Sequence, residues 1–595
     1  MVLEFKKSRQ DALNSRQVSG RFLIPGRAIG DVVFSNVPIS FMMGVDIETG
    51  MVMDKHHPLY GTSIKGKIFA LPCGRGSCGG SGVMLEILRQ QVAPAALVFR
   101  KMEEILTLGV LVSKMMFFRS IPVILLEDDE AFGLLENANV AQIKEGQLII
   151  GNGDVRIPLL TTTAERVVLT EADRRVLNGD GCSIAKRTAM EIIVEFSAIQ
   201  GAKSLADVSQ VHVDACCYAG KISLLIPERL HALGGEFVVP ATCNSLDVDR
   251  QRWKELEADP EISKISSKIG DIYLAMGAQM SFTCAPYLLN TKPGIGEQVA
   301  WGESNAVVFS NSVLGARTQK YPDFLEVMIA LTGRAPYAGC HLDEGRLPKI
   351  RILVPKFNNP DESLFPLLGY HIGDLVGSEI PIIYGLEDSK PSIADLKAFG
   401  AGFATTSSAP MFHINGITPE AAKVNIDLAK LPHVALDLCK LRLTWKQLNT
   451  AKETYVDLIS LGNPHFDLEE FARLAALCMG RCKQSDVTMI ITTSRYVYQE
   501  ALNKGYLEII ESFGARLITD TCWCMIQEPV IPPHSRTIMT NSAKYAHYGP
   551  GMLKRGYHFG SLAGCVEASC MGERRPDDIA PRWLFGPPSE LLCQV

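Results

Sequence analysis

The chain has 595 residues, of which 47% are apolar and 21% are charged. These fractions are typical of a globular protein, and they exclude a disordered, collagen-like or coiled-coil chain. The formal net charge of −6, from 59 basic and 65 acidic side chains, argues against a nucleic-acid-binding protein, which usually carries a basic surplus.

Short strands separated by Gly and Pro are predicted from residue 18 to about residue 127, for example in DVVFSN, KGKIFAL, AALVFR and IPVILL. One helix, GVMLEILRQQ, is predicted after the loop PCGRGSCGGSG. A β-hairpin built on GNGD is predicted over residues 141–158. Together these elements predict a small α/β domain, to which we assign residues 1–160.

A new helix is predicted at LTEADRRVL, because a Thr followed three residues later by Asp resembles a capping box. We place the domain boundary near residues 155–168. Beyond it, strands such as QVHVDACC and EFVVPATCNS alternate with helices such as ISLLIPERLHALGG and those of DRQRWKELEADPEISKISSKIGDIYLAMGA. This alternation predicts a mostly parallel sheet covered by helices.

A second α/β stretch is predicted from residue 350 to about residue 500, with KIRILVP, IPIIYG and FATTSSAPMFHI as its first segments. VTMIITTS, ARLITDTC and SRTIMTNSAKYA supply further strands. The large region, residues 161–595, is therefore expected to contain one lobe from residues 168–350 plus 500–595 and another from 350–500.

The 16 cysteines contain no CxxC pair, so a zinc ribbon or finger has no support in the sequence. No run of about 18 apolar residues predicts a transmembrane helix, and the polar start MVLEFKKSRQ lacks the apolar core of a secretory signal. We therefore expect a cytoplasmic protein with reduced cysteines, most of them buried as small hydrophobic residues.

A glycine-rich loop, LPCGRGSCGGSG, places Ser77 and Ser81 directly before a predicted helix. Free N–H groups at a helix start bind anions, and they also stabilise a serine alkoxide. The loop is not a P-loop, because no GK[ST] follows the glycines. The alternative is a plain glycine-rich turn.

Further candidates lie at predicted strand ends and helix starts, where parallel sheets bind ligands. Cys522 and Lys544 follow strands, and Cys565 lies in the first turns of a helix that lowers a thiol pKa. Cys284 precedes a segment rich in Gly, Ser and Asn that contains Glu297, Gln298, Glu303, Ser304, Asn305, Asn311, Ser312 and Arg317. The alternatives are core packing for the cysteines and a buried polar network for the segment.

Taken in order, these segments resemble the aconitase X family, the cluster-dependent hydro-lyase branch of the aconitase superfamily, over nearly the whole chain. The small domain is similar to the family's swivelling domain. The large part is similar through LTEADRRVL, HVDACCYAG, TCAPY, GEQVAWGESNAVVFSNSVLGART, LTGRAPYAGCHLDEGR, LGNPHFDLEEF, DTCWC, TNSAKYAHYGPG and FGSLAGCV. The implied fold is an N-terminal swivelling β/α domain fused to a multi-lobed α/β region, whereas classical aconitase carries its swivel domain at the C-terminus.

The resemblance implies that Cys284, Cys522 and Cys565 hold an iron–sulfur cluster with an open iron that acts as a Lewis acid. It also implies that Ser77 is the base, with Ser81 as the alternative. Lys544 is expected to act in catalysis. The predicted substrate-binding residues are Arg75, Cys78, Ser81, Ala215, Cys216, Cys217, Asn244, Ser245, Glu303, Asn305 and Ser312.

The family has two branches, an archaeal one that is usually two-chain and dehydrates 5-phosphomevalonate, and an often fused one that dehydrates cis-3-hydroxy-L-proline. The fused chain favours the second branch, whose cluster is of the [2Fe-2S] type; a [4Fe-4S] cluster and mononuclear iron are alternatives. Loops poor in Lys and Arg also disfavour a phosphorylated substrate. The runs MGAQMSF and DACCY depart from the family at the expected pocket, which leaves another 3-hydroxy acid open.

The expected reaction removes water from a small-molecule substrate, with no nucleic acid or membrane as partner, and closure of the swivel domain is expected to complete the site. The product would be 1-pyrroline-2-carboxylate, formed by tautomerisation of an enamine. A non-catalytic iron-sensing regulatory protein and a zinc or cluster-free isomerase are the alternatives of other classes. The assembly is expected to be a monomer or a small homo-oligomer.

Overall fold

The computed structural model describes residues 17–42, 44–54, 57–75, 78–151, 153, 155–161, 164–575 and 579–586. The chain forms two compact units. Unit 1 comprises Met1–Ala215, Ala219–Pro240 and Tyr321–Ala338, and unit 2 comprises Cys216–Tyr218, Ala241–Lys320 and Gly339–Val595. The predicted domain boundary near 155–168 stays a prediction. Across the described ranges, no helix is long and apolar enough to cross a membrane.

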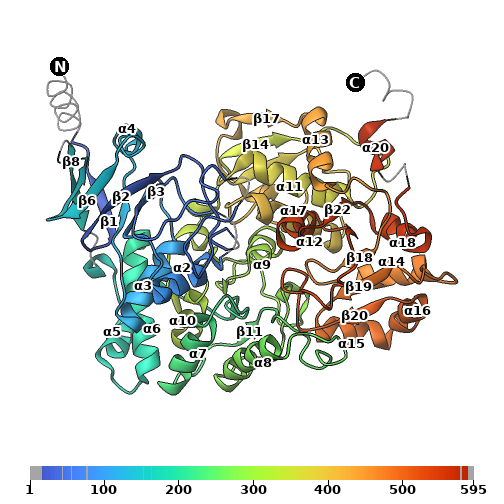
Figure 1. Ribbon diagram of the computed structural model, residues 1–595, viewed down its shortest axis with the longest axis horizontal. Coiled ribbons are helices and arrows are strands. Elements are labelled where there is room, and N and C mark those ends of the chain that lie inside the picture. Colours follow the sequence, from blue (N-terminus) through green and yellow to red (C-terminus); the bar gives the residue numbers. More distant parts are fainter. Residues whose placement is uncertain are drawn as a thin grey trace. The chain divides into compact units, whose positions relative to one another are not determined.

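A closed eight-stranded barrel, in the order β1-β5-β4-β3-β2-β6-β7-β8, forms the N-terminal part of unit 1 (Figure 1). Its strands are β1 Gly20–Ile24, β2 Ala28–Phe34, β3 Ile68–Leu71, β4 Ala96–Phe99, β5 Val123–Leu125, β6 Val140–Lys144, β7 Gln147–Ile150 and β8 Val155–Thr161. The strands β2 to β5 run parallel, so their carboxyl ends share one edge. The glycine-rich loop leaves this edge after β3.

The barrel carries three helices, α2 Gly80–Gln90, α3 Ile105–Phe117 and α4 Asp129–Gly133. The strands and α2 agree with the predictions, but α3 was missed. Most residues of α3 are buried, so its sequence ILTLGVLVSKMMF lacks the polar face that makes a helix recognisable. Helices α2 and α3 pack against each other.

The rest of unit 1 is built from α5 Glu171–Asn178, α6 Ile184–Gln200, β9 Leu205–Asp207, β10 Val211–Val213, α7 Ile222–Ala232, α10 Leu325–Thr332 and β13 Arg334–Pro336. The predicted capping box is confirmed: the Thr170 hydroxyl accepts from the Asp173 N–H, and Asp173 accepts from the Thr170 N–H. β13 pairs with β9, and α10 packs on α6 and β10.

Unit 2 contains a four-stranded parallel sheet in the order β16-β15-β14-β17. Its elements are β14 Ile350–Leu353, α11 Leu364–Val376, β15 Pro381–Tyr384, α12 Ile393–Thr406, β16 His413–Ile414, β17 His433–Ala435 and α13 Leu438–Leu448. The elements before it are β11 Ala241–Cys243, α8 Pro260–Ala275, β12 Ala300–Trp301 and α9 Ser304–Phe309.

A second parallel sheet of unit 2, in the order β20-β19-β18-β21-β22, is the framework of the candidate site. It is built from β18 Leu458–Leu461, α14 Leu468–Cys478, β19 Thr488–Thr492, α15 Arg495–Asn503, α16 Tyr506–Phe513, β20 Arg516–Ile518, β21 Thr537–Thr540, α17 Ala543–Leu553, β22 Gly556–Phe559, α18 Leu562–Met571 and α20 Arg582–Phe585. Figure 1 shows β18, β19 and β20 side by side, near α14, α15 and α16.

Short helical turns join these elements: η1 Ala164–Arg166, η2 Pro286–Leu288, the π-helical η3 Ser310–Leu314, η4 Gly339–His341, η5 Glu344–Arg346, η6 Ala421–Lys423 and η7 Leu428–Lys430. Three strand and helix predictions were too long. EFVVPATCNS forms only β11, residues 250–259 form turns before α8, and FATTSSAPMFHI begins as the end of α12. Asp259 ends the turns because its carboxylate caps α8 and Pro260 disfavours a helical residue before it.

Candidate active site

The carboxyl edge of the sheet β20-β19-β18-β21-β22 gathers most of the site residues predicted in unit 2. Cys522 follows β20, Asn463 follows β18, Lys544 follows β21, and Cys565 lies in the first turns of α18 after β22. Because all five strands are parallel, their carboxyl ends open at one edge, where ligands bind in α/β folds. The fold therefore brings together residues that are far apart in the sequence.

Hydrogen bonds join Cys522 to two other thiols at this edge. The Cys522 side chain is hydrogen-bonded to both Cys284 and Cys524. Cys284 and Cys522 are 2% and 7% exposed, and Cys565 is fully buried. Cys524 was not predicted as a site residue, although it belongs to the same DTCWC motif as Cys522.

Charge and hydrogen bonds favour a thiolate at Cys284 and at Cys524, whereas the hydrogen bonds with these two thiols, together with burial, raise the pKa of Cys522. Burial raises the pKa of Cys284, but the hydrogen bond with Cys522 and the nearby Lys544 cation outweigh burial and hold that pKa below its usual value. The hydrogen bond with Cys522 also lowers the pKa of Cys524 to about 6. The backbone N–H of His465 donates to Cys284 Sγ at 3.4 Å. Thiolates are the form of cysteine that binds metal.

A buried ion pair faces the thiols. Lys544 Nζ lies 3.0 Å from Glu303 Oε1, and each side chain is 13% exposed. Burial raises the pKa of Glu303, but the Lys544 charge and hydrogen bonds from Asn305 outweigh it and lower the pKa to about 2. Both groups are therefore charged at neutral pH.

Amide side chains extend this ion pair into a network. Asn305 Nδ2 donates to Glu303 Oε1 at 2.6 Å and to the Cys284 carbonyl at 3.1 Å, and Tyr287 OH donates to Asn305 Oδ1 at 2.8 Å. Asn244 Nδ2 donates to Glu303 Oε2 at 3.3 Å. The network connects Glu303 to the backbone of the thiol-bearing loop at Cys284.

Three buried polar atoms of these loops have no hydrogen-bond partner among the described residues: Ser245 Oγ, Asn463 Oδ1 and Thr521 Oγ1. Buried polar groups are normally hydrogen-bonded, and each exception requires an explanation. Thr521 directly precedes Cys522, and Asn463 Nδ2 donates to Cys524 Sγ at 3.4 Å. A bound ligand at this edge would supply the missing partners.

A buried lysine forms hydrogen bonds and ion pairs with the loop after β18. Lys397 of α12 donates to the His465 carbonyl at 3.0 Å and forms ion pairs with Asp467 at 2.8 Å and with Glu470. Its side chain is 1% exposed. Lys397 thereby fixes the loop whose His465 N–H reaches Cys284, a role that the sequence did not indicate.

Lys397→Met is expected to lower the free energy of unfolding by about 3–5 kcal/mol, because the Asp467 carboxylate, whose pKa the Lys397 charge helps to lower, would stay buried without its counter-charge. The matched control is Lys356→Met, whose lysine is 88% exposed and should change stability by less than about 0.5 kcal/mol. Urea unfolding followed by tryptophan fluorescence measures both. Equal effects of the two substitutions would contradict the structural role of Lys397.

In unit 1, the glycine-rich loop starts at the carboxyl end of β3. Ser77 and Gly76 lie outside the described residues, so the predicted base stays a prediction. Arg75 forms an ion pair with Asp54 at 3.1 Å and is half exposed. Ser81 is fully buried, and its hydroxyl lies within hydrogen-bond distance of the carbonyls of Cys78 and Asp323.

The remaining predicted substrate residues are distributed over both units. The Ala215 N–H donates to Glu326 at 3.0 Å in unit 1. Cys216 is buried and Cys217 is half-buried. The Ser312 hydroxyl accepts from the Phe412 N–H at 2.9 Å. The substrate contacts of these residues stay predictions.

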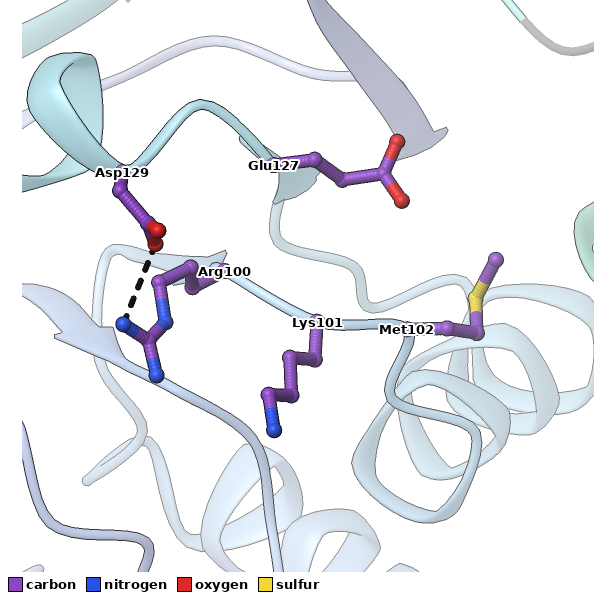
Figure 2. Close-up of a pocket in the computed structure, with 5 residues that line it drawn as sticks. All are labelled: Arg100, Lys101, Met102, Glu127 and Asp129. Carbon is purple, nitrogen blue, oxygen red and sulfur yellow. Dashed lines mark hydrogen bonds and ion pairs between the residues drawn. The ribbon is translucent and has the colours of Figure 1, made fainter. Parts of the chain in front are cut away.

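An open pocket of about 360 Å³ lies at the carboxyl ends of β4 and β5 in unit 1 (Figure 2). It is lined by Arg100, Lys101, Met102, Glu127 and Asp129, none of which the sequence singled out. Arg100 is paired with Asp129 at 3.1 Å, and the Lys101 N–H donates to the Pro72 carbonyl at 2.9 Å. The pocket therefore adjoins the start of the glycine-rich loop.

No three His, Cys, Asp or Glu side chains converge on one point within the part of the chain that the structure describes, as a single metal ion would require. The assignment of Cys284, Cys522 and Cys565 as ligands of an iron–sulfur cluster therefore stays a prediction.

Four family models match the chain in sequence order. They are the aconitase X swivel domain over residues 17–151, the first domain over 166–344, the second over 348–452 and the third over 456–571. The solved structure of Thermococcus kodakaraensis aconitase X in its holo-form is also similar. It has a TM-score of 0.62 and 29% identity, and the match covers 68% of this chain and 100% of that one.

Several dehydratases are similar to this chain in sequence. The cis-3-hydroxy-L-proline dehydratase of Hypocrea jecorina is 47% identical over 93% of this chain and 95% of its own length, and that of Pseudomonas aeruginosa is 45% identical over 95% and 98%. The phosphomevalonate dehydratase large subunit of Methanothermobacter thermautotrophicus is 33% identical over 65% of this chain and 95% of its own. The chain therefore belongs to the aconitase X family, with its swivel domain at the N-terminus, and it is a hydro-lyase of the dehydratase type.

Proposed function

We propose that this chain dehydrates cis-3-hydroxy-L-proline to 1-pyrroline-2-carboxylate with the help of an iron–sulfur cluster. One observation carries the choice of substrate: the 47% identity to a cis-3-hydroxy-L-proline dehydratase extends over 95% of that enzyme, swivel domain included. The phosphomevalonate relative is a separate large subunit that matches only 65% of this chain.

Cys284, Cys522 and Cys565 are the proposed cluster ligands. The chemistry of the site fits a cluster, because Lys544 and the His465 N–H stabilise negative charge on sulfur, and the buried polar atoms Ser245 Oγ and Thr521 Oγ1 lack partners. When bound, a cluster with one open iron supplies a Lewis acid for oxygen atoms of the substrate. A [2Fe-2S] cluster is the proposed type.

Lys544 and Glu303 are the proposed binding pair for the substrate's charges. An amino acid such as hydroxyproline carries a carboxylate and a ring ammonium, and a buried cation beside a buried anion is complementary to both. Asn305 and Asn244 hold Glu303 in place, so the pair is oriented before the substrate arrives. Orientation of this kind lowers the barrier without further contacts.

Ser77 is the proposed base that removes the proton from Cα. The 3-hydroxyl group leaves as water with the proton that Ser77 has taken up, which regenerates the Ser77 anion, and the electron pair of the Cα–H bond becomes the Cα–Cβ double bond of an enamine. The enamine tautomerises to the imine 1-pyrroline-2-carboxylate. Because a serine hydroxyl is a weak acid, its anion needs the positive end of α2, which starts at Gly80 without a side-chain cap.

A turnover assay with cis-3-hydroxy-L-proline and 5-phosphomevalonate side by side tests the choice of substrate. The chain should be purified without oxygen and reconstituted with iron and sulfide. We expect kcat/KM for cis-3-hydroxy-L-proline to exceed that for 5-phosphomevalonate by at least about 100-fold, because only one substrate offers the ammonium group. Turnover of 5-phosphomevalonate alone, or of neither compound, would contradict the proposal.

A further inference from the structure

The N-terminal end of α10 contacts two predicted site loops of unit 1. All eight residues of this helix are buried, and it packs on α6 and β10. Asp323, two residues before the helix, contacts the glycine-rich loop. Glu326, in the first turn, contacts the loop after β10 that carries Ala215. Two loops from distant parts of the sequence thus meet one helix end.

The contact with the glycine-rich loop is made by the backbone of Asp323. Its N–H donates to the Cys78 carbonyl at 3.3 Å, and its carbonyl lies 3.1 Å from the Ser81 hydroxyl. Phe324 follows with a φ of +79°, a left-handed conformation that is unfavourable for a residue with a side chain. Such a conformation persists only where the surrounding contacts hold it, so the turn is a specific feature of this fold.

The contact with the loop after β10 is made by the Glu326 carboxyl group. Its Oε1 accepts from the N–H groups of Asp214 at 3.1 Å and of Ala215 at 3.0 Å. Glu326 is fully buried, and its Oε2 has no hydrogen-bond partner among the described residues. Burial, together with the negative charge of Asp214, raises the pKa of Glu326 to about 8. The group is therefore a neutral acid at pH 7, and an amide would be its closest substitute.

We infer that Glu326 is a positioning residue. Its hydrogen bonds with the N–H groups of Asp214 and Ala215, called the tie below, connect the Ala215 loop to the end of α10 that is also hydrogen-bonded to the glycine-rich loop. The tie fixes the mutual position of two parts of the candidate site, and displacements of about 1 Å cost enzymes about 100-fold in rate. The expected loss of turnover rests on the proposed function of these loops. The tie is a structural feature and does not rest on that function.

Hydrogen exchange of the full chain, read by mass spectrometry, tests the tie independently of turnover. We expect Glu326→Ala to raise amide exchange about tenfold or more in residues 78–83 and 211–216, because two N–H groups lose their acceptor and the helix end loosens. Glu326→Gln retains the acceptor oxygen and should stay within about twofold of the wild type. The control Glu171→Ala, an exposed glutamate in the first turn of α5, should leave both segments unchanged.

If amide hydrogen exchange in either residues 78–83 or residues 211–216 is the same in Glu326→Ala as in the wild type, the tie is overturned. If that variant does not fold, Ser81→Ala tests the other half, because it removes only the hydroxyl beside the Asp323 carbonyl. We then expect faster exchange in residues 78–83, and wild-type exchange there would overturn the inference.

Measurements of kcat distinguish a positioning role of Glu326 from a role in the chemical step. Glu326→Gln should keep kcat within about threefold, whereas Glu326→Ala should lower kcat about 30-fold or more with an unchanged iron content. Equal damage in both variants would assign Glu326 a chemical role and overturn the positioning role. If the wild-type chain itself has no turnover, the proposed function fails, while the exchange experiment still decides the tie.

Discussion

Cys284→Ala is expected to lose the visible charge-transfer absorbance of a cluster and to lower turnover by about 10³-fold or more. Cys284 is one of three proposed ligands, and it is hydrogen-bonded to the Cys522 thiol and accepts from the His465 N–H. Removing it leaves too few thiolates to retain iron. The absorbance spectrum and the iron content per chain, measured on anaerobically reconstituted protein, report the loss directly.

The matched control is Cys340→Ala. Cys340 is also a fully buried cysteine of unit 2, but burial raises the pKa of its thiol to about 12, so it stays protonated. The control should keep the wild-type spectrum, iron content and turnover. If Cys284→Ala retained iron and colour like the control, Cys284 would not be a ligand.

Ser77→Ala is expected to keep the cluster spectrum and to lower kcat by about 10²–10⁴-fold, because a general base contributes about this factor. The loss should appear in kcat and leave iron content unchanged, which separates a missing base from a missing cluster. Steady-state assays of the same preparation, together with its absorbance spectrum, measure both quantities.

Two further serine variants in unit 1 complete this test. Ser120→Ala changes an exposed serine and should behave like the wild type. Ser81→Ala should lose less activity than Ser77→Ala, since the Ser81 hydroxyl lies between two backbone carbonyls and acts in positioning. Wild-type turnover in Ser77→Ala would transfer the base to another residue, with Ser81 the first to be tested.

Local patterns predicted much of the fold. The alternating strands of the barrel, the parallel sheets and the capping box at Thr170 and Asp173 follow from rules that act over a few residues. Helix α3 was missed because it is buried on most sides and shows no polar face. The helix predicted before Pro260 did not form. Helix α8 begins only at Pro260, and Asp259 is its N-cap residue.

The structure places two predicted site residues after parallel strands, as the sequence indicated: Cys522 follows β20 and Lys544 follows β21. Asn463 after β18 satisfies the same rule but was overlooked. The functional roles of these residues stay predictions. The order β20-β19-β18-β21-β22 is not encoded in any short motif, so the contact between Cys284 and the loop of His465 could not be read from spacing.

Lys397 shows the limit of such reasoning most clearly. It lies on α12, where a lysine is usually solvent-exposed, yet it is buried against Asp467 and Glu470. Only the packing of α12 against the loop after β18 reveals this role. Positioning residues of this kind carry no sequence signature, because their function depends on the tertiary structure alone.

A reconstitution series tests whether this chain dehydrates cis-3-hydroxy-L-proline through an iron–sulfur cluster. Iron and sulfide content per chain are plotted against the rate of 1-pyrroline-2-carboxylate formation. We expect the rate to rise in proportion to cluster content and to vanish in iron-free protein. Full turnover by iron-free protein would exclude a role of the cluster in the reaction.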